Sequence, residues 1–138
     1  MTIVVFDLVH WDAAYGTLAR FEHELPDFAA ELDAAFPPPT VFIYRTPTFF
    51  AGDDALAERN SGRRWLSSAK VLRMHTLALA ALRRSPLSAR LRVWDVFAIG
   101  EARQLAATLA HLAACQNGHE RAEDIALENQ VLMNLVCG

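Results

Sequence analysis

Short, uniformly apolar runs alternate along this chain with longer stretches in which apolar residues recur at helical spacing. Three runs rich in β-branched and aromatic residues are typical of buried strands, at residues 3–8, 41–45 and 91–96. Four stretches have the spacing of amphipathic helices, at residues 13–36, 64–84, 101–115 and 121–137. The order strand, helix, strand, loop, helix, strand, helix, helix predicts an α/β domain with a short parallel sheet and helices on both faces.

Proline and glycine residues divide this pattern. Pro26 should interrupt or kink the first helix, with Asp27 capping a second segment, and Pro37–Pro39 should end it. Residues 46–62 form a long loop after the second strand, a position at which loops are often functional. Three strands make a thin sheet with two exposed edges, so we expect another chain to supply strands, or an N-terminal part of an ordinary domain to be missing.

Composition narrows the class of protein. The 138 residues suffice for one domain, and 53% hydrophobic with 21% charged residues exclude a disordered chain. A net charge of −3 without a basic face argues against nucleic acid. No apolar stretch reaches 18 residues, so no membrane span is expected. No secretory signal is visible, which favours an intracellular or organellar location.

The cysteine and histidine residues do not predict a metal site. Cys115 and Cys137 could pair, or both could be reduced and half-buried. His111, Cys115 and His119 follow at four-residue intervals, but Gly118 should break the helix that would bring them to one face. We therefore expect neither a metal ion nor another cofactor.

A catalytic signal lies near the C-terminal end of the sequence. His119 follows Gly118 in a turn and precedes the closing helix, which is where some α/β esterases place their catalytic base. Such a base usually has an acid three residues before it, and here that position is Gln116, an amide. An amide carries no charge to stabilise an imidazolium.

Five stretches resemble, in order, the blocks of one hydrolase superfamily, at residues 4–11, 41–47, 71–78, 94–97 and 117–138. The first reads VVFDLVHW, where one branch often has Asn-x-Gly-His-Trp, and the third has His75 where a helix of the family usually has Asn. On these motifs the chain resembles the C-terminal two-thirds of the SGNH (GDSL-like) hydrolases. The most similar branch is that of the PC-esterase and trichome-birefringence-like proteins, which act on acyl esters or polysaccharide O-acetyl groups.

This resemblance implies a truncated flavodoxin-like, SGNH-type three-layer fold. Residues 1–138 would form a single partial domain that lacks the N-terminal nucleophile block. Five serines are available, but none follows a buried strand in a tight glycine-containing turn, at positions 61, 67, 68, 85 and 88. The family's serine nucleophile therefore has no counterpart in this chain.

The resemblance also assigns degenerate catalytic positions. His119 would stand at the base, Gln116 at the acid and Asp7 at the asparagine that donates to the oxyanion. An ionised carboxylate cannot donate a hydrogen bond to an oxyanion and would repel it. Val9 replaces the glycine of the turn, which weakens any backbone approach to a ligand.

Four further residues are candidates for binding. His10 and Trp11 match the family's turn, and Arg45 belongs to the Arg-Thr ending of the second strand. Asp95 ends the third strand, at the edge where open α/β sheets bind ligands. Alternatively, these residues have structural roles only: His10 is a surface histidine, Trp11 caps the end of the sheet and Asp95 caps the next turn.

The resemblance and its departures together predict a non-catalytic, degenerate SGNH-hydrolase-like protein. It would act as a structural or accessory subunit of a larger assembly, with other protein subunits as partners. The alternative is an acyl esterase, or an O-acetyl hydrolase or transferase, that acts on a small-molecule ester and receives its serine block from another chain. A third reading is a small-molecule binding module that uses the pocket at the strand ends.

Overall fold

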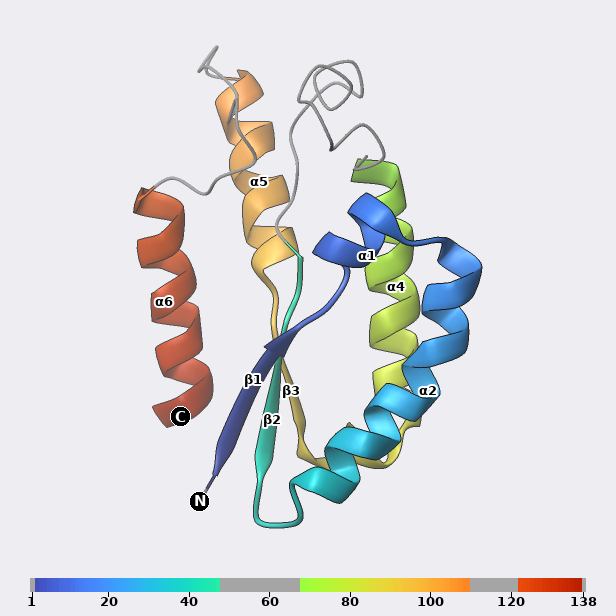
Figure 1. Cartoon of the computed structure of the whole chain (residues 1–138). Coiled ribbons are helices and arrows are strands. Elements are labelled where there is room, and N and C mark those ends of the chain that lie inside the picture. The colour runs from blue at the N-terminus through green and yellow to red at the C-terminus, as the bar shows by residue number, and fades with distance from the viewer. Residues whose placement is uncertain (1, 48–67, 110–121, 138) are drawn as a thin grey trace.

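Among the described residues, the sheet has three parallel strands, as the sequence predicted, and their order is β1-β2-β3. The computed structural model describes residues 2–47, 68–109 and 122–137 (Figure 1). The strands are β1 (Ile3–Asp7), β2 (Val41–Arg45) and β3 (Leu91–Trp94). Ile3 pairs with Val41 across β1 and β2. The molecule is thus a mixed α/β domain around a short parallel sheet.

Strand β2 is the centre of the sheet and carries its most buried residues. Phe42, Ile43 and Tyr44 have at most 1% of their surface exposed, because β2 is paired on both sides and covered on both faces. No residue of β1 is buried to that extent, and Val5 is 48% exposed. Both strands are largely apolar, so their different burial follows from their places in the sheet.

The chain after β1 forms two helices, α1 (His10–Tyr15) and α2 (Leu18–Ala35). The break falls at Gly16 and Thr17, and α2 continues through Pro26 and Asp27, so the predicted interruption at Pro26 and the capping role of Asp27 were wrong. Thr17 caps α2, since its hydroxyl accepts from the Arg20 N–H at 3.3 Å. Pro26 is tolerated inside α2 because it lies on the exposed side, where water can reach the carbonyl that it leaves unpaired.

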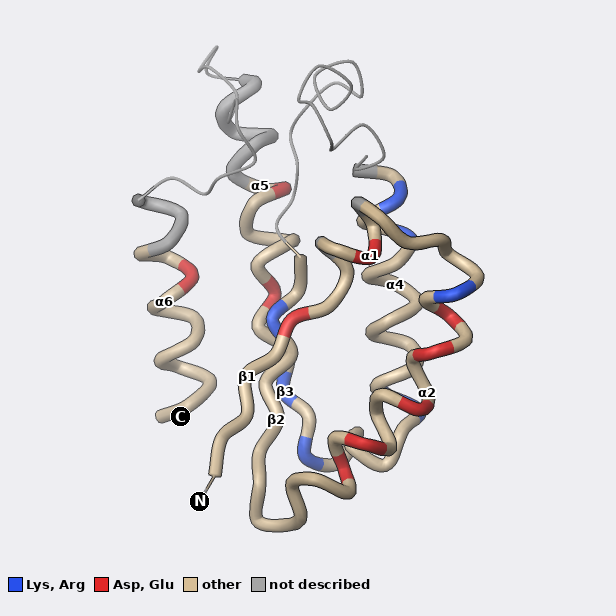
Figure 2. Tube along the Cα trace, in the orientation of Figure 1, with Lys and Arg blue, Asp and Glu red and all other residues tan. Residues whose placement is uncertain are grey.

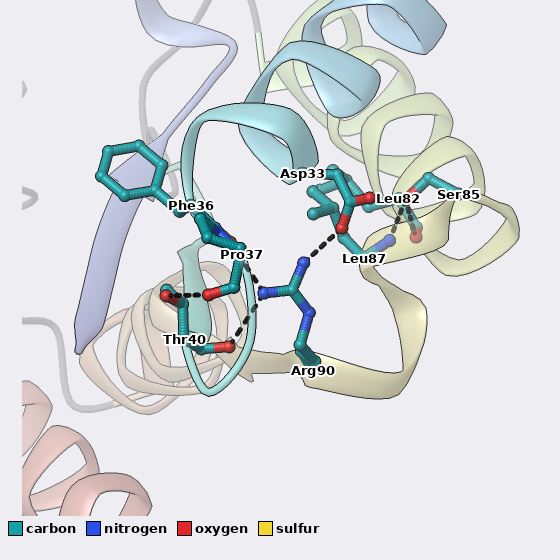
Figure 3. Close-up of polar contacts among 8 residues, drawn as sticks. All are labelled: Asp33, Phe36, Pro37, Thr40, Leu82, Ser85, Leu87 and Arg90. Atoms are coloured by element: carbon teal, nitrogen blue, oxygen red, sulfur yellow. Dashed lines mark hydrogen bonds and ion pairs between the residues drawn. The ribbon is translucent and has the colours of Figure 1, made fainter. Parts of the chain in front are cut away.

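Helix α2 packs beside α4 (Ser68–Arg84) on one face of the sheet (Figure 1). Four apolar residues of α4 are fully buried there at helical spacing, Val71, Met74, Ala78 and Leu82. The short 3₁₀ helix η1 (Pro86–Arg90) leads from α4 into β3. Arg90 links η1 to the C-terminal end of α2 and to the turn before β2. Its guanidinium donates to the carbonyls of Phe36 and Thr40 and pairs with Asp33 (Figure 3).

The opposite face of the sheet is covered by α6 (Ala122–Cys137), which packs on Ile43 and Trp94. The prediction of helices on both faces is therefore confirmed (Figure 1). Strand β3 ends at Trp94 and α5 (Val96–Leu109) begins after Asp95, so Val96 belongs to the helix and not to the predicted strand 91–96, and α5 begins five residues before the predicted Glu101. Asp95 explains the difference, since its carboxylate accepts from the Ala98 N–H at 3.0 Å and so caps the helix.

No helix within the described ranges is long and apolar enough to cross a membrane. This agrees with the expectation from the sequence.

Candidate functional site

The carboxyl ends of the three strands meet at one edge of the sheet, as parallel pairing requires. Asp7 and Arg45 are partners in the register of β1 and β2, and Asp95 directly follows the end of β3. Helix α1 begins at His10, three residues beyond Asp7, although the His10 side chain is outside the described part. We call Asp7, Tyr44, Arg45, Thr46 and Asp95 the carboxyl edge. His119 and Gln116 lie outside the described residues.

Arg45 makes a partly buried contact between the sheet and α6. Its Nη2 atom lies 3.1 Å from Oε2 of Glu128, and its guanidinium lies 5.4 Å from the centre of the Trp94 ring. Glu128 is 4% exposed and belongs to the stripe of α6 that faces the sheet. Arg45, which was predicted to bind a ligand, therefore links the carboxyl edge to α6 through its ion pair with Glu128. Glu128 was missed from the sequence, although its place on the apolar stripe of α6 was a signal.

Thr46 and Asp95 organise the start of α5. The Thr46 hydroxyl donates to Oδ1 of Asp95 at 3.3 Å and accepts from the Phe97 N–H at 2.9 Å. Because Asp95 Oδ1 also accepts from the Ala98 N–H, both side chains satisfy backbone groups of the first turn. Asp95 thus caps the helix that follows it, the structural role that the sequence allowed beside ligand binding, and the residue remains exposed.

Tyr44, a buried residue of the carboxyl edge, contacts the buried His75 of α4. Tyr44 Oη and His75 Nδ1 are 3.4 Å apart, and the His75 ring stacks on Phe97 with centroids 5.6 Å apart. Burial raises the pKa of Tyr44, with smaller contributions from the carboxylates of Asp7 and Asp95. Burial lowers the pKa of His75, which Asp95 partly offsets. Both side chains are therefore uncharged near neutral pH, and the pair holds α4 and β2 together.

Trp11 lies on the solvent side of α1. It is 75% exposed and stacks on Tyr15, with ring centroids 5.6 Å apart and an angle of 15° between the planes. The two side chains are four residues apart, which places them on one side of the helix. Trp11 does not cap the sheet end, contrary to the ordinary alternative for this residue.

The turn between β1 and α1 has an unusual backbone. Val9 has φ 94° and ψ −48°, a positive φ that glycine adopts more readily than other residues, and its side chain is only 1% exposed. Its carbonyl accepts from the Ala13 N–H at 2.6 Å, which fixes the start of α1. A non-glycine residue in so sparsely populated a conformation costs about 1–3 kcal/mol. The surrounding structure, including the buried valine side chain, must offset that cost.

The chemistry available at the carboxyl edge is limited. Among the described residues, no three of His, Cys, Asp and Glu gather as metal ligands. Ser85 lies at the other end of the sheet, where its hydroxyl donates to the Leu82 carbonyl and accepts from the Leu87 N–H (Figure 3).

No family model, curated protein or solved structure matches the chain.

Proposed function

We propose that the chain is a degenerate SGNH-hydrolase-like domain of the PC-esterase type, with a truncated flavodoxin-like arrangement. In this proposal it does not catalyse ester hydrolysis and serves as a structural or accessory subunit of a larger protein assembly. The observation that carries the proposal is the conformation of Val9.

Val9 stands where the family's Asn-x-Gly-His-Trp turn has glycine, and its φ of 94° is one that glycine adopts without strain. A β-branched residue has no intrinsic reason to occupy that region. An inherited turn that kept its shape after glycine was replaced accounts for the outlier. The same replacement removes the open backbone that a ligand could approach.

Asp7 supports the loss of catalysis. It ends β1 two residues before Val9, at the position from which the family's asparagine donates to an oxyanion. A carboxylate there accepts hydrogen bonds and repels the developing negative charge. The neighbouring polar side chains have structural tasks, because Arg45 binds Glu128 and both Thr46 and Asp95 hold the start of α5.

The proposal is tested by assaying the purified full chain with p-nitrophenyl acetate. We expect the same rate from the natural chain, from His119→Ala and from a heat-denatured sample, because a histidine without a nucleophile, oxyanion donors and an orienting acid gives only background hydrolysis. Saturable turnover that His119→Ala abolishes would overturn the non-catalytic proposal. If such turnover arose only after a second protein was added, it would favour the esterase alternative.

A further inference from the structure

We infer that two copies of this chain associate through their β1 strands, in antiparallel pairing about a two-fold axis at Val5, to form one continuous six-stranded sheet. This inference rests on the proposed role in an assembly and names the partner as a second copy. It is carried by the backbone of β1, by its side chains and by the position of its single charge.

The backbone groups of β1 divide between its two sides. The Val41 N–H donates to the Thr2 carbonyl at 2.9 Å, and β1 pairs with β2 from Ile3 onward. Because successive residues of a strand point their N–H and C=O groups to opposite sides, Val4 and Phe6 face β2, and Ile3, Val5 and Asp7 face away from it. Three N–H and three C=O groups therefore line the outer side of β1.

The sequence of β1 carries none of the residues that proteins use to protect a sheet edge. It reads Ile-Val-Val-Phe-Asp, with no lysine, no proline and no charge until its last residue (Figure 2). The opposite edge strand, β3, carries Arg92, which is exposed and donates to the Leu135 carbonyl of α6. In Figure 1, β1 is the outer strand, with α6 to one side of the sheet and α2 and α4 to the other.

A two-fold axis at Val5 satisfies all of these outer groups at once. Val5 then lies opposite Val5 of the second copy, and Ile3 lies opposite Asp7, so each outward residue faces another outward residue. This arrangement forms six backbone hydrogen bonds. On the face that packs against α2 and α4, Val4 lies opposite Phe6 of the second copy, a pairing of a β-branched with an aromatic residue that stabilises sheets.

The charge of Asp7 also favours this register. With Val5 on the axis, the two Asp7 residues are four positions apart along the strands, a distance of about 14 Å. That exceeds the screening length of about 8 Å at physiological salt, so their repulsion is small. Moving the axis to Phe6 would bring the two Asp7 carboxylates to within two positions of each other along the strands, about 7 Å.

The mass of the full chain in solution, measured by light scattering during gel filtration, tests the inference. We expect twice the monomer mass of 15.3 kDa. Val5→Lys and Val5→Glu should each be monomeric, because two like charges would lie opposite each other on the axis. An equimolar mixture of these variants should regain the dimer mass, which shows that both are folded. Leu72→Lys is a matched control, since Leu72 is 46% exposed on α4, and it should remain dimeric.

A monomeric natural chain, or dimers in both Val5 variants, would overturn the inference. The ester assay reports separately on the proposed loss of catalysis, so an inactive monomer would refute only the dimer, and an active dimer would refute only the non-catalytic proposal.

Discussion

Val9 is the residue whose backbone conformation conflicts most with its type. At an ordinary position glycine is less stable than alanine by about 0.5–1 kcal/mol. At Val9, with φ 94°, we expect the reverse, because alanine keeps the strain of a left-handed backbone and glycine does not. Val9→Gly should unfold at higher urea than Val9→Ala, by a free-energy difference of about 1 kcal/mol. Equal stability, or a more stable Val9→Ala, would mean that the turn is not of the glycine type.

His75 should make the stability of the protein depend on pH. Burial lowers its pKa below the value near 6.5 of the unfolded chain, with Asp95 opposing and Arg83 adding to the shift. His75 therefore binds a proton more readily in the unfolded state than in the folded state. Its contribution to the free energy of unfolding is fully present above pH 6.5 and is lost as pH falls toward the folded pKa. His75→Asn should flatten the pH dependence of urea unfolding in this range. His23→Asn, at an exposed position on α2, should leave it unchanged.

At the scale of elements, α1 depends on a contact from α4. Six residues are too few for a helix that is stable alone. The Lys70 ammonium donates to the carbonyls of Ala13 and Gly16, at 2.6 and 2.9 Å, and so satisfies the C-terminal end of α1. Lys70→Met should lower the free energy of unfolding by about 1–3 kcal/mol and remove hydrogen-exchange protection from α1.

The control for this prediction is Arg73→Met, at an exposed position on the same helix, which should change stability by no more than about 0.5 kcal/mol. If the two variants lost the same stability, Lys70 would have no special role at α1.

The sequence predicted which elements exist better than where they begin. The three strands followed from their apolar runs, and their parallel pairing places Asp7, Arg45 and Asp95 at one end of the sheet. The boundaries of α1, α2 and α5 depended on local hydrogen bonds of Thr17 and Asp95, which hydrophobic spacing does not report. Arg45–Glu128 and Tyr44–His75 could not be predicted, because each joins residues that only the packing of distant helices brings together.

For the whole molecule, the two faces of the sheet are covered to different extents. The α4 residues against the sheet are fully buried, whereas the residues of α6 that pack there are only partly buried, Val131, Leu132, Leu135 and Val136. A helix that buries less apolar surface opens at a lower free energy. We therefore expect α6 to open before α4 in native-state hydrogen exchange.

The contact between Arg45 and Glu128 should determine the difference between the opening free energies of α6 and α4. Glu128→Gln keeps the size of the buried side chain but removes the charge that Arg45 binds. Because Arg45 is partly exposed to water, the loss should be moderate, about 1–3 kcal/mol in the opening free energy of α6, with little change for α4. Glu31→Gln, at an exposed position on α2, should alter neither helix. Exchange of α6 and α4 at a common free energy, shifted together by Glu128→Gln, would show instead that both faces of the sheet unfold as one cooperative unit.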